Sequence, residues 1–202
     1  WKHYSNKDRF DFRHEIEYGI TDRLQLGVYL ADWRYEDKDG GDSKADYKSS
    51  GVELIYQLTD PNKSAFGSAL YGEVLVGDEK IKLEAKFLLQ KNIGPLVLVY
   101  NAILEAEWEG ESLDNLDESV GVWENTFGAS YQINPSFFVG VEAVHEIEFA
   151  EWSDAGDHVV SVGPNISFRK GNFFTTLAGL FQVTDVDGEP ESQLRVLAGI
   201  TF

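Results

Sequence analysis

Hydrophobic and polar residues alternate along most of the chain, with the period of two residues that is typical of β-strands. The pattern is clearest between Ser192 and Phe202. One face of this segment carries the apolar residues Leu194, Val196, Ala198, Ile200 and Phe202. The other face carries Gln193, Arg195, Leu197, Gly199 and Thr201. Such alternation predicts a strand whose two faces meet unlike environments.

The same pattern predicts eleven strands. They span roughly residues 9–19, 23–35, 47–58, 65–76, 79–91, 95–108, 119–132, 136–150, 157–169, 172–184 and 192–202. Short turns with Pro, Gly, Asn or Asp, such as those at Asp60-Pro61 and Asn134-Pro135, separate some neighbours. The alternate connections are longer, at 36–46, 109–118, 151–156 and 185–191. Short turns on one rim and long loops on the other are typical of transmembrane barrels.

The 202 residues therefore predict one all-β domain, 1–202, folded as an antiparallel transmembrane β-barrel. No apolar run approaches the ~20 residues that a membrane-spanning helix needs. Aromatic residues nevertheless make up 13% of the chain, as expected for strands with one apolar face. A soluble barrel with its apolar face inward would give the same one-dimensional pattern. Periodicity alone leaves both alternatives open.

The placement of aromatic residues favours the membrane. In the predicted register, four tryptophans lie near the long loops: Trp33, Trp108, Trp123 and Trp152. A second group lies near the short turns, and includes Tyr18, Tyr56, Tyr131 and Phe202. Two such belts are expected where strands cross two membrane interfaces.

The hairpin from Phe10 to Tyr35, FDFRHEIEYGITDRLQLGVYLADWRY, resembles hairpins of uncharacterised porin-like barrels. The alternating last strand that closes on Phe202 resembles the C-terminal signal of Gram-negative outer-membrane β-barrel proteins. These resemblances imply a barrel in the bacterial outer membrane. They imply no particular substrate.

The strand count raises a question of parity. If the last strand ends in the periplasm, the first, from Arg9 to Gly19, also runs downward, although single-chain bacterial barrels have an even number of strands. Residues 2–8, KHYSNKD, are too polar for the missing upward strand and are predicted to form an outer loop. We therefore expect twelve strands in the complete protein, with the first one preceding Trp1. The absence of Met likewise indicates a mature or partial product.

The polar faces carry many charges that the register points into the barrel. The predicted lumen-facing charged residues are Arg13, Glu15, Glu17, Glu53, Glu73, Lys82, Glu84, Lys86, Glu105, Glu124, Glu142, Glu146 and Arg195. Acidic residues dominate this set, which is consistent with a cation-preferring pore. A network of salt bridges that plugs and braces the barrel is the alternative, because buried charges need partners.

The net charge of −18 excludes nucleic acid as a partner. The long connections are acidic, and segments such as 37–42 could bind divalent cations weakly, although they lack the full spacing of a calcium loop. We expect outer-membrane lipid as the main partner. The outer loops, or an open barrel edge, could also contact another protein.

No catalytic constellation or cofactor motif is evident. His145 lies on the predicted lipid-facing side, where the outer-membrane phospholipase carries a Ser–His–Asn set. No Ser or Asn is predicted beside it, and the other histidines form no metal-ligand spacing. The sequence thus predicts a non-enzymatic outer-membrane barrel, either a narrow passive pore or a structural envelope protein. The alternatives are a docking platform and, after it, an outer-membrane hydrolase.

Overall fold

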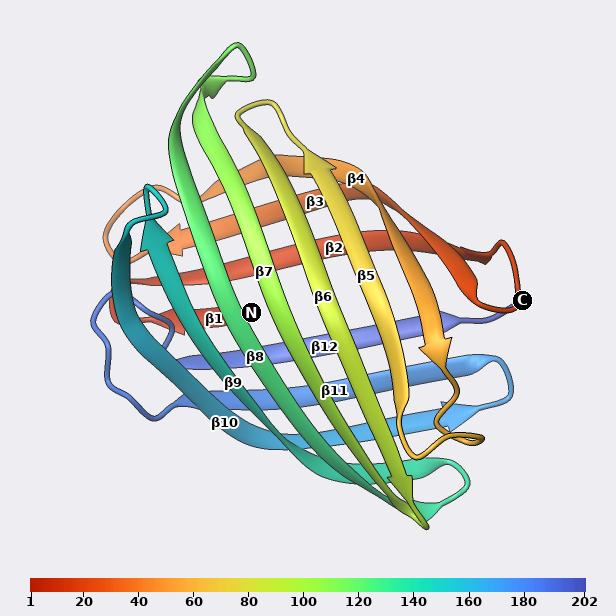
Figure 1. Cartoon of the computed structure of the whole chain (residues 1–202). Coiled ribbons are helices and arrows are strands. Elements are labelled where there is room, and N and C mark those ends of the chain that lie inside the picture. Colours follow the sequence, from red (N-terminus) through yellow and green to blue (C-terminus); the bar gives the residue numbers. More distant parts are fainter.

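The structure, a computed structural model, describes all residues from Trp1 to Phe202 as one closed antiparallel barrel of twelve β-strands (Figure 1). The strands are β1 (Lys2–Tyr4), β2 (Lys7–Gly19), β3 (Leu24–Lys38), β4 (Lys44–Thr59), β5 (Gly67–Val76), β6 (Lys80–Ile93), β7 (Leu96–Ser112), β8 (Asn115–Asn134), β9 (Phe137–Ala150), β10 (Asp154–Lys170), β11 (Phe173–Gln182) and β12 (Ser192–Ile200). Each strand pairs with its sequence neighbours, and β1 also pairs with β12. The predicted fold class is therefore confirmed. The structure contains no helix long and apolar enough to cross a membrane.

Apolar side chains point outward and charged ones inward. On β4, Val52, Leu54 and Tyr56 are 45% to 47% exposed, whereas Glu53 between them is only 4% exposed. Exposed large apolar residues recur on β5, β9 and β12, while the buried polar residues include three glutamates. An exposed apolar face and a buried polar one are the informative departures from ordinary burial. The alternative that places the apolar faces inside does not hold.

The barrel wall is uneven in height. Strands β7 and β8 contain 17 and 20 residues, whereas β11 and β12 contain 10 and 9. The β7–β8 hairpin therefore projects beyond its neighbours (green in Figure 1). The prediction of a loop over 109–118 is wrong, because strand pairing continues to Ser112 and resumes at Asn115. The sequence did not reveal this extension, because the projecting ends of the strands have no apolar face and therefore show no alternation of apolar and polar residues.

The prediction that residues 2–8 form a loop is also wrong. Lys2–Tyr4 form β1, which lies antiparallel to both β2 and β12. Trp1 extends this pairing, since its backbone exchanges two hydrogen bonds of 2.9 Å with Leu194. These residues escaped notice because strand pairing uses backbone groups, and so short a strand carries no readable alternation. Beyond β1, the 10–19 part of β2 and the 195–200 part of β12 are paired on one side only.

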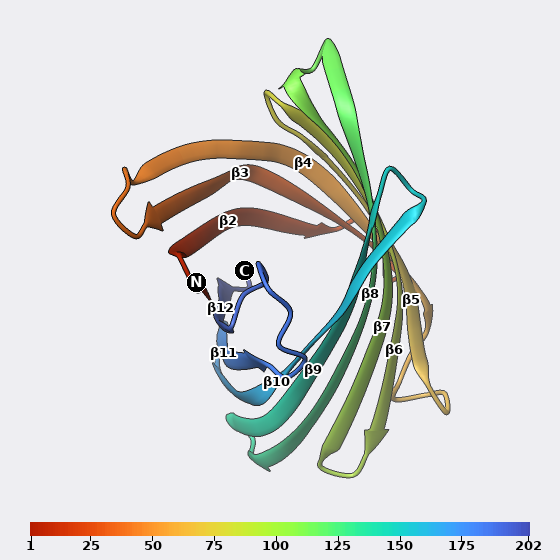
Figure 2. The ribbon, with the colours of Figure 1, turned by 90° about the vertical axis from the view of Figure 1, so that its left-hand side faces the viewer.

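The two rims differ. We call the rim that carries the 183–191 connection the loop rim, and the opposite rim, where Phe202 lies, the turn rim. Because the strands alternate in direction, 39–43 and 113–114 share the loop rim, whereas 60–66 and 135–136 lie at the turn rim. Figure 2 shows the 183–191 connection, in blue, folded across the opening of the barrel.

Strands β10 and β11 approach closely at Gly163. A Cβ atom built there would lie 1.7 Å from the carbonyl oxygen of Gly179. The paired register also skips Gly163 between Val162 and Asn165. Only glycine fits this position without moving a backbone.

We predict that Gly163→Ala lowers the free energy of unfolding by about 1–3 kcal/mol, as overpacking does. The matched control is Gly179→Ala on the facing strand, because a Cβ at Gly179 meets no atom within 4 Å. Urea unfolding of the two variants in the same detergent measures the difference. Equal stability of both variants would contradict the close approach.

Candidate functional site

A row of glutamates runs along the inner wall over four adjacent strands. The strand register places Glu53 on β4 opposite Glu73 on β5, Glu73 opposite Glu84 on β6, and Glu84 opposite Glu105 on β7. We call these four residues the glutamate layer. Each lies at an inward position of its strand, and Glu53, Glu73 and Glu84 are at most 8% exposed. Directly opposed like charges are destabilising unless cations or donors lie between them.

Arg13 of β2 compensates one end of this layer. Its guanidinium lies 3.2 Å from Glu73 and 3.1 Å from Asp32 of β3. It also lies over the Tyr29 ring, 4.3 Å from the ring centroid. The Glu73 side chain is fully buried and accepts a second hydrogen bond, of 2.7 Å, from the Tyr71 hydroxyl. Glu73 is therefore held by a cation and a neutral donor.

Two lysines of β6 compensate the other end. The Lys82 ammonium lies 3.2 Å from Glu84 and 2.6 Å from Glu105. Lys86 pairs with Glu84 from the opposite side and lies 4.3 Å from the Tyr71 ring centroid. The inward faces of β2 to β7 thus form one connected network of carboxylates, cations and tyrosines.

A third group of carboxylates adjoins the layer. Ligand oxygens of Glu15, Glu17 and Glu53 all lie within 4.8 Å of one another. Gly27 makes room for them, because a Cβ there would lie 2.4 Å from both Glu15 and Glu53. Tyr29 also donates a hydrogen bond to Glu53. Three oxygens at this spacing could ligate a hard cation such as Ca²⁺. The acidic loop 37–42 forms no comparable group.

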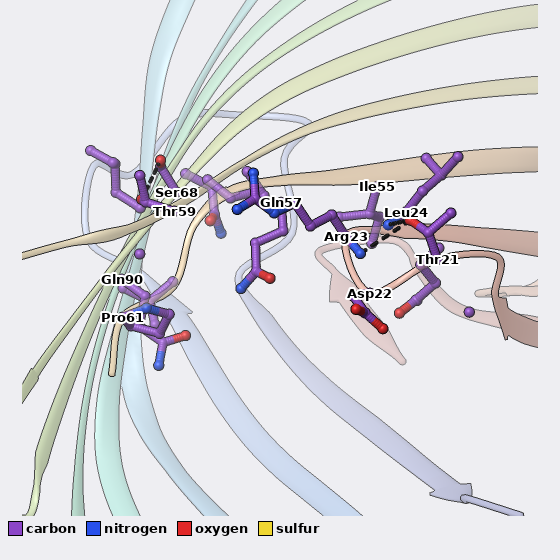
Figure 3. A pocket seen from close by; sticks show the side chains of 18 residues that line it. Thr21, Asp22, Arg23, Leu24, Ile55, Gln57, Thr59, Pro61, Ser68 and Gln90 are labelled. Atoms are coloured by element: carbon purple, nitrogen blue, oxygen red, sulfur yellow. Dashed lines mark hydrogen bonds between the residues drawn. The ribbon is translucent and has the colours of Figure 1, made fainter. Parts of the chain in front are cut away.

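The glutamate layer separates two cavities. A cavity of about 820 Å³ opens toward the loop rim, and we call it the vestibule. Another of about 450 Å³ lies near the turn rim (Figure 3). The two share no lining residue. On β5, for example, Ala69 lines the second cavity and Leu75 the vestibule, and buried Tyr71 and Glu73 fill the inward positions between them. Buried side chains therefore lie between the two cavities on this strand.

The vestibule has walls of opposite charge. The wall formed by β12, β1, β2 and β3 is mainly basic. It carries Lys2, Arg9, Arg34 and Arg195, together with the carboxylates Asp11 and Asp32. The acidic wall belongs to β7, β8 and β9, and carries Glu107, Glu124, Glu146 and Glu148. Glu189 reaches the same cavity from the 183–191 connection, and burial together with Glu146 and Glu148 raises its pKa. Opposed charges of this kind set up an electric field across the cavity.

The lining of the turn-rim cavity includes the neutral polar residues Gln25, Gln57, Gln90 and Asn101, and its charged residues are Asp22 and Arg23. Thr21 and Thr59 fix its edges through local hydrogen bonds, as Figure 3 shows. In the adjacent turn, the backbone N–H of Asn62 donates to Asp60 at 2.8 Å, and Lys63 lies 3.1 Å away. Both contacts lower the pKa of Asp60, the backbone bond most.

The remaining predicted lumen residues lie on the other half of the wall. Glu142 accepts a 2.8 Å hydrogen bond from Asn165. Glu124 and Glu146 stand opposite each other in the register. Arg195 contacts Gln193 at 2.9 Å and reaches no carboxylate. These residues do not join the glutamate layer.

The predicted aromatic belts lie on the outer face. Toward the loop rim, Trp33 packs edge-on against Tyr47, and the Trp108 and Trp152 rings lie 5.9 Å apart. Trp123 faces outward on the neighbouring strand, opposite Ile147. Toward the turn rim, the exposed aromatic residues are Tyr18, Tyr56, Tyr131 and Phe202.

One outer-wall feature escaped the sequence analysis. The expectation that no Asn adjoins His145 is wrong, because Asn125 of β8 stands directly opposite it and lies 3.3 Å from its ring. His158, expected to stand alone, lies 2.9 Å from the same ring. A bulge between Ala155 and His158 sets this register, and no one-dimensional pattern reveals it.

Removing Arg13 tests the electrostatics of the layer. Arg13→Ala leaves the buried Glu73 carboxylate without its cation, which should cost about 3 kcal/mol of unfolding free energy. Arg195→Ala, which removes an inward arginine with no carboxylate partner, is the control and should change stability little. Adding Glu73→Gln to Arg13→Ala should recover part of the loss. Equal destabilisation by the two arginine variants would refute the role of Arg13.

Comparison with known proteins places the fold in a family. No protein of curated function matches the chain. Residues 2–195 match the model of a family described as a family of unknown function, DUF6662. The match runs from β1 into β12, so it includes the glutamate layer and the outer wall alike. The chain belongs to this family.

Proposed function

We propose that the protein is a bacterial outer-membrane barrel with an occluded lumen, which serves as a structural envelope protein rather than as an open pore. Its apolar outer wall between two aromatic belts supports the location, since such a wall is unfavourable in water. The resemblance of the Phe10–Tyr35 hairpin and of the last strand to outer-membrane barrels supports it as well. In the proposed orientation, the loop rim faces the outside of the cell and the turn rim faces the periplasm.

The closed glutamate layer carries the proposal of an occluded lumen. Twelve strands enclose less space than the sixteen or more of open porins. Here, Tyr29, Tyr71 and the paired carboxylates fill that space and separate the two cavities. Ions crossing the barrel would have to break several buried ion pairs. A passive pore of appreciable conductance is therefore disfavoured.

Planar-bilayer recordings test the occlusion. The native protein should show no stable channel steps. Tyr29→Ala combined with Tyr71→Ala should create cation-preferring steps, because it removes the two rings and leaves the glutamates, and acidic rings favour cations. Tyr56→Ala, the same change on the outer face, should produce no channel steps. Stable channels in the native protein would overturn the proposal in favour of a pore.

Paired arginine substitutions on β3 test the membrane location. Val28 is at an outward position and Gln25 lines the turn-rim cavity. Arginine on a lipid-facing midplane position costs roughly 2–4 kcal/mol, whereas a lumen position tolerates it. Val28→Arg should therefore reduce heat-resistant barrel in isolated outer membranes far more than Gln25→Arg. Similar levels of both variants would reject the orientation of the wall.

A further inference from the structure

Four polar side chains form a hydrogen-bonded chain on the outer wall. They come from four adjacent strands: Tyr100 of β7, Asn125 of β8, His145 of β9 and His158 of β10. The Tyr100 hydroxyl donates to Asn125 Oδ1 at 2.7 Å. The Asn125 amide nitrogen lies 3.3 Å from His145 Nδ1, and His145 Nε2 lies 2.9 Å from His158 Nδ1. We call these four residues the outer polar chain.

The pattern of hydrogen-bond donors and acceptors gives the outer polar chain a direction. With its oxygen bonded to Tyr100, Asn125 donates its amide hydrogen to His145 Nδ1. His145 then carries its proton on Nε2 and donates it to His158 Nδ1. A neutral imidazole has one donor and one acceptor nitrogen, so His158 carries its own proton on Nε2. The chain therefore ends in an N–H donor that none of its members accepts.

Such a chain is costly on a wall that faces hydrocarbon. Ionisable residues in membrane-spanning segments are rare, and those present are typically functional. His145 and His158 stack with their ring centroids 5.1 Å apart. His145 lies one outward position below Ile147, whereas His158 stands directly opposite Ile147, level with Trp123. They thus lie near the polar edge of the apolar band, within reach of a lipid headgroup.

An apolar groove of about 420 Å³ runs along the same wall from the outer polar chain toward the turn rim. Tyr100 belongs to both features. Below Asn125 on β8 the groove wall continues with Phe127, and below His145 on β9 it continues with Ala143. The small side chains of Ala129 and Ala143 hollow the groove between larger neighbours.

We propose that this wall binds one phospholipid, with an acyl chain in the groove and the phosphate at the His145–His158 pair. This inference rests on the proposed membrane location. The free N–H of His158 matches a phosphate oxygen, which is a strong hydrogen-bond acceptor. The groove itself offers apolar contact along its whole length.

Lys91 is the competing headgroup site. It lines the opposite end of the groove, where its ammonium lies 4.6 Å from the Phe66 ring centroid. A phosphate at Lys91 would leave the outer polar chain facing lipid tails without a ligand. The four side chains that converge at the other end therefore favour the histidine pair.

Native mass spectrometry with dioleoylphosphatidylglycerol tests the site, with dioleoylglycerol as the probe that lacks phosphate. The native protein should retain one phosphatidylglycerol and bind dioleoylglycerol far less. His145→Leu with His158→Leu should weaken retention roughly tenfold or more, as loss of a hydrogen bond to a charged group does. Ala143→Phe, which fills the groove and leaves both imidazoles, should also weaken it. The control is His14→Leu, a histidine on the distant strand β2.

Several outcomes would overturn the site. Equal retention of both probes would exclude phosphate recognition. Loss of binding in Lys91→Gln with full binding in the double histidine variant would move the headgroup to the other end. Liposome flotation of every variant separates these results from failure of the proposed location. Variants that float and bind equally refute the lipid site alone, whereas a native protein that does not float refutes both.

Discussion

The cross-strand hydrogen-bond ladder is the constraint on which the rest of this structure depends. Of 142 backbone hydrogen bonds, 123 lie within the strands, and they fix which residues stand opposite one another around the barrel. A shift of one residue would turn every charged side chain toward the outside. The glutamate layer, the two differently charged walls of the vestibule and the outer polar chain all follow from this one register.

The register creates a problem in the interior that the side chains solve locally. It sets glutamates against glutamates on four adjacent strands, in a space where water is scarce. Lys82 and Lys86 compensate them from inward positions of β6 itself, and Arg13 reaches Glu73 of β5 from β2. These ion pairs lie within β6, between β6 and β7, and between β2 and β5, and the walls of the vestibule keep charges of their own.

Much of this arrangement could be read from the sequence, because a period of two residues reports directly on two-faced strands. Eleven strands and the inward direction of residues such as Glu53 follow from alternation alone. Alternation fails where backbone pairing occurs without an apolar face, as in β1 and in the projecting part of β7. It also says nothing about which strand positions are level with each other. Bulges determine which positions are level. The contacts of His145 with Asn125 and His158 could therefore be seen only in the structure.

The uneven wall has a consequence for how molecules from outside first meet this protein. The β7–β8 hairpin stands above the opposite side and carries Glu109, Glu111 and Asp114 near its tip. The low side is roofed by the 183–191 connection, whose Pro190 is buried and bonded through its carbonyl to Gln182. An approaching solute therefore encounters the negatively charged tip of the β7–β8 hairpin before it reaches the opening of the barrel. Such a field slows the arrival of anions and speeds that of cations, in a way that falls with ionic strength. The surface charge of the barrel thus distinguishes cations from anions by the rate at which they reach its opening.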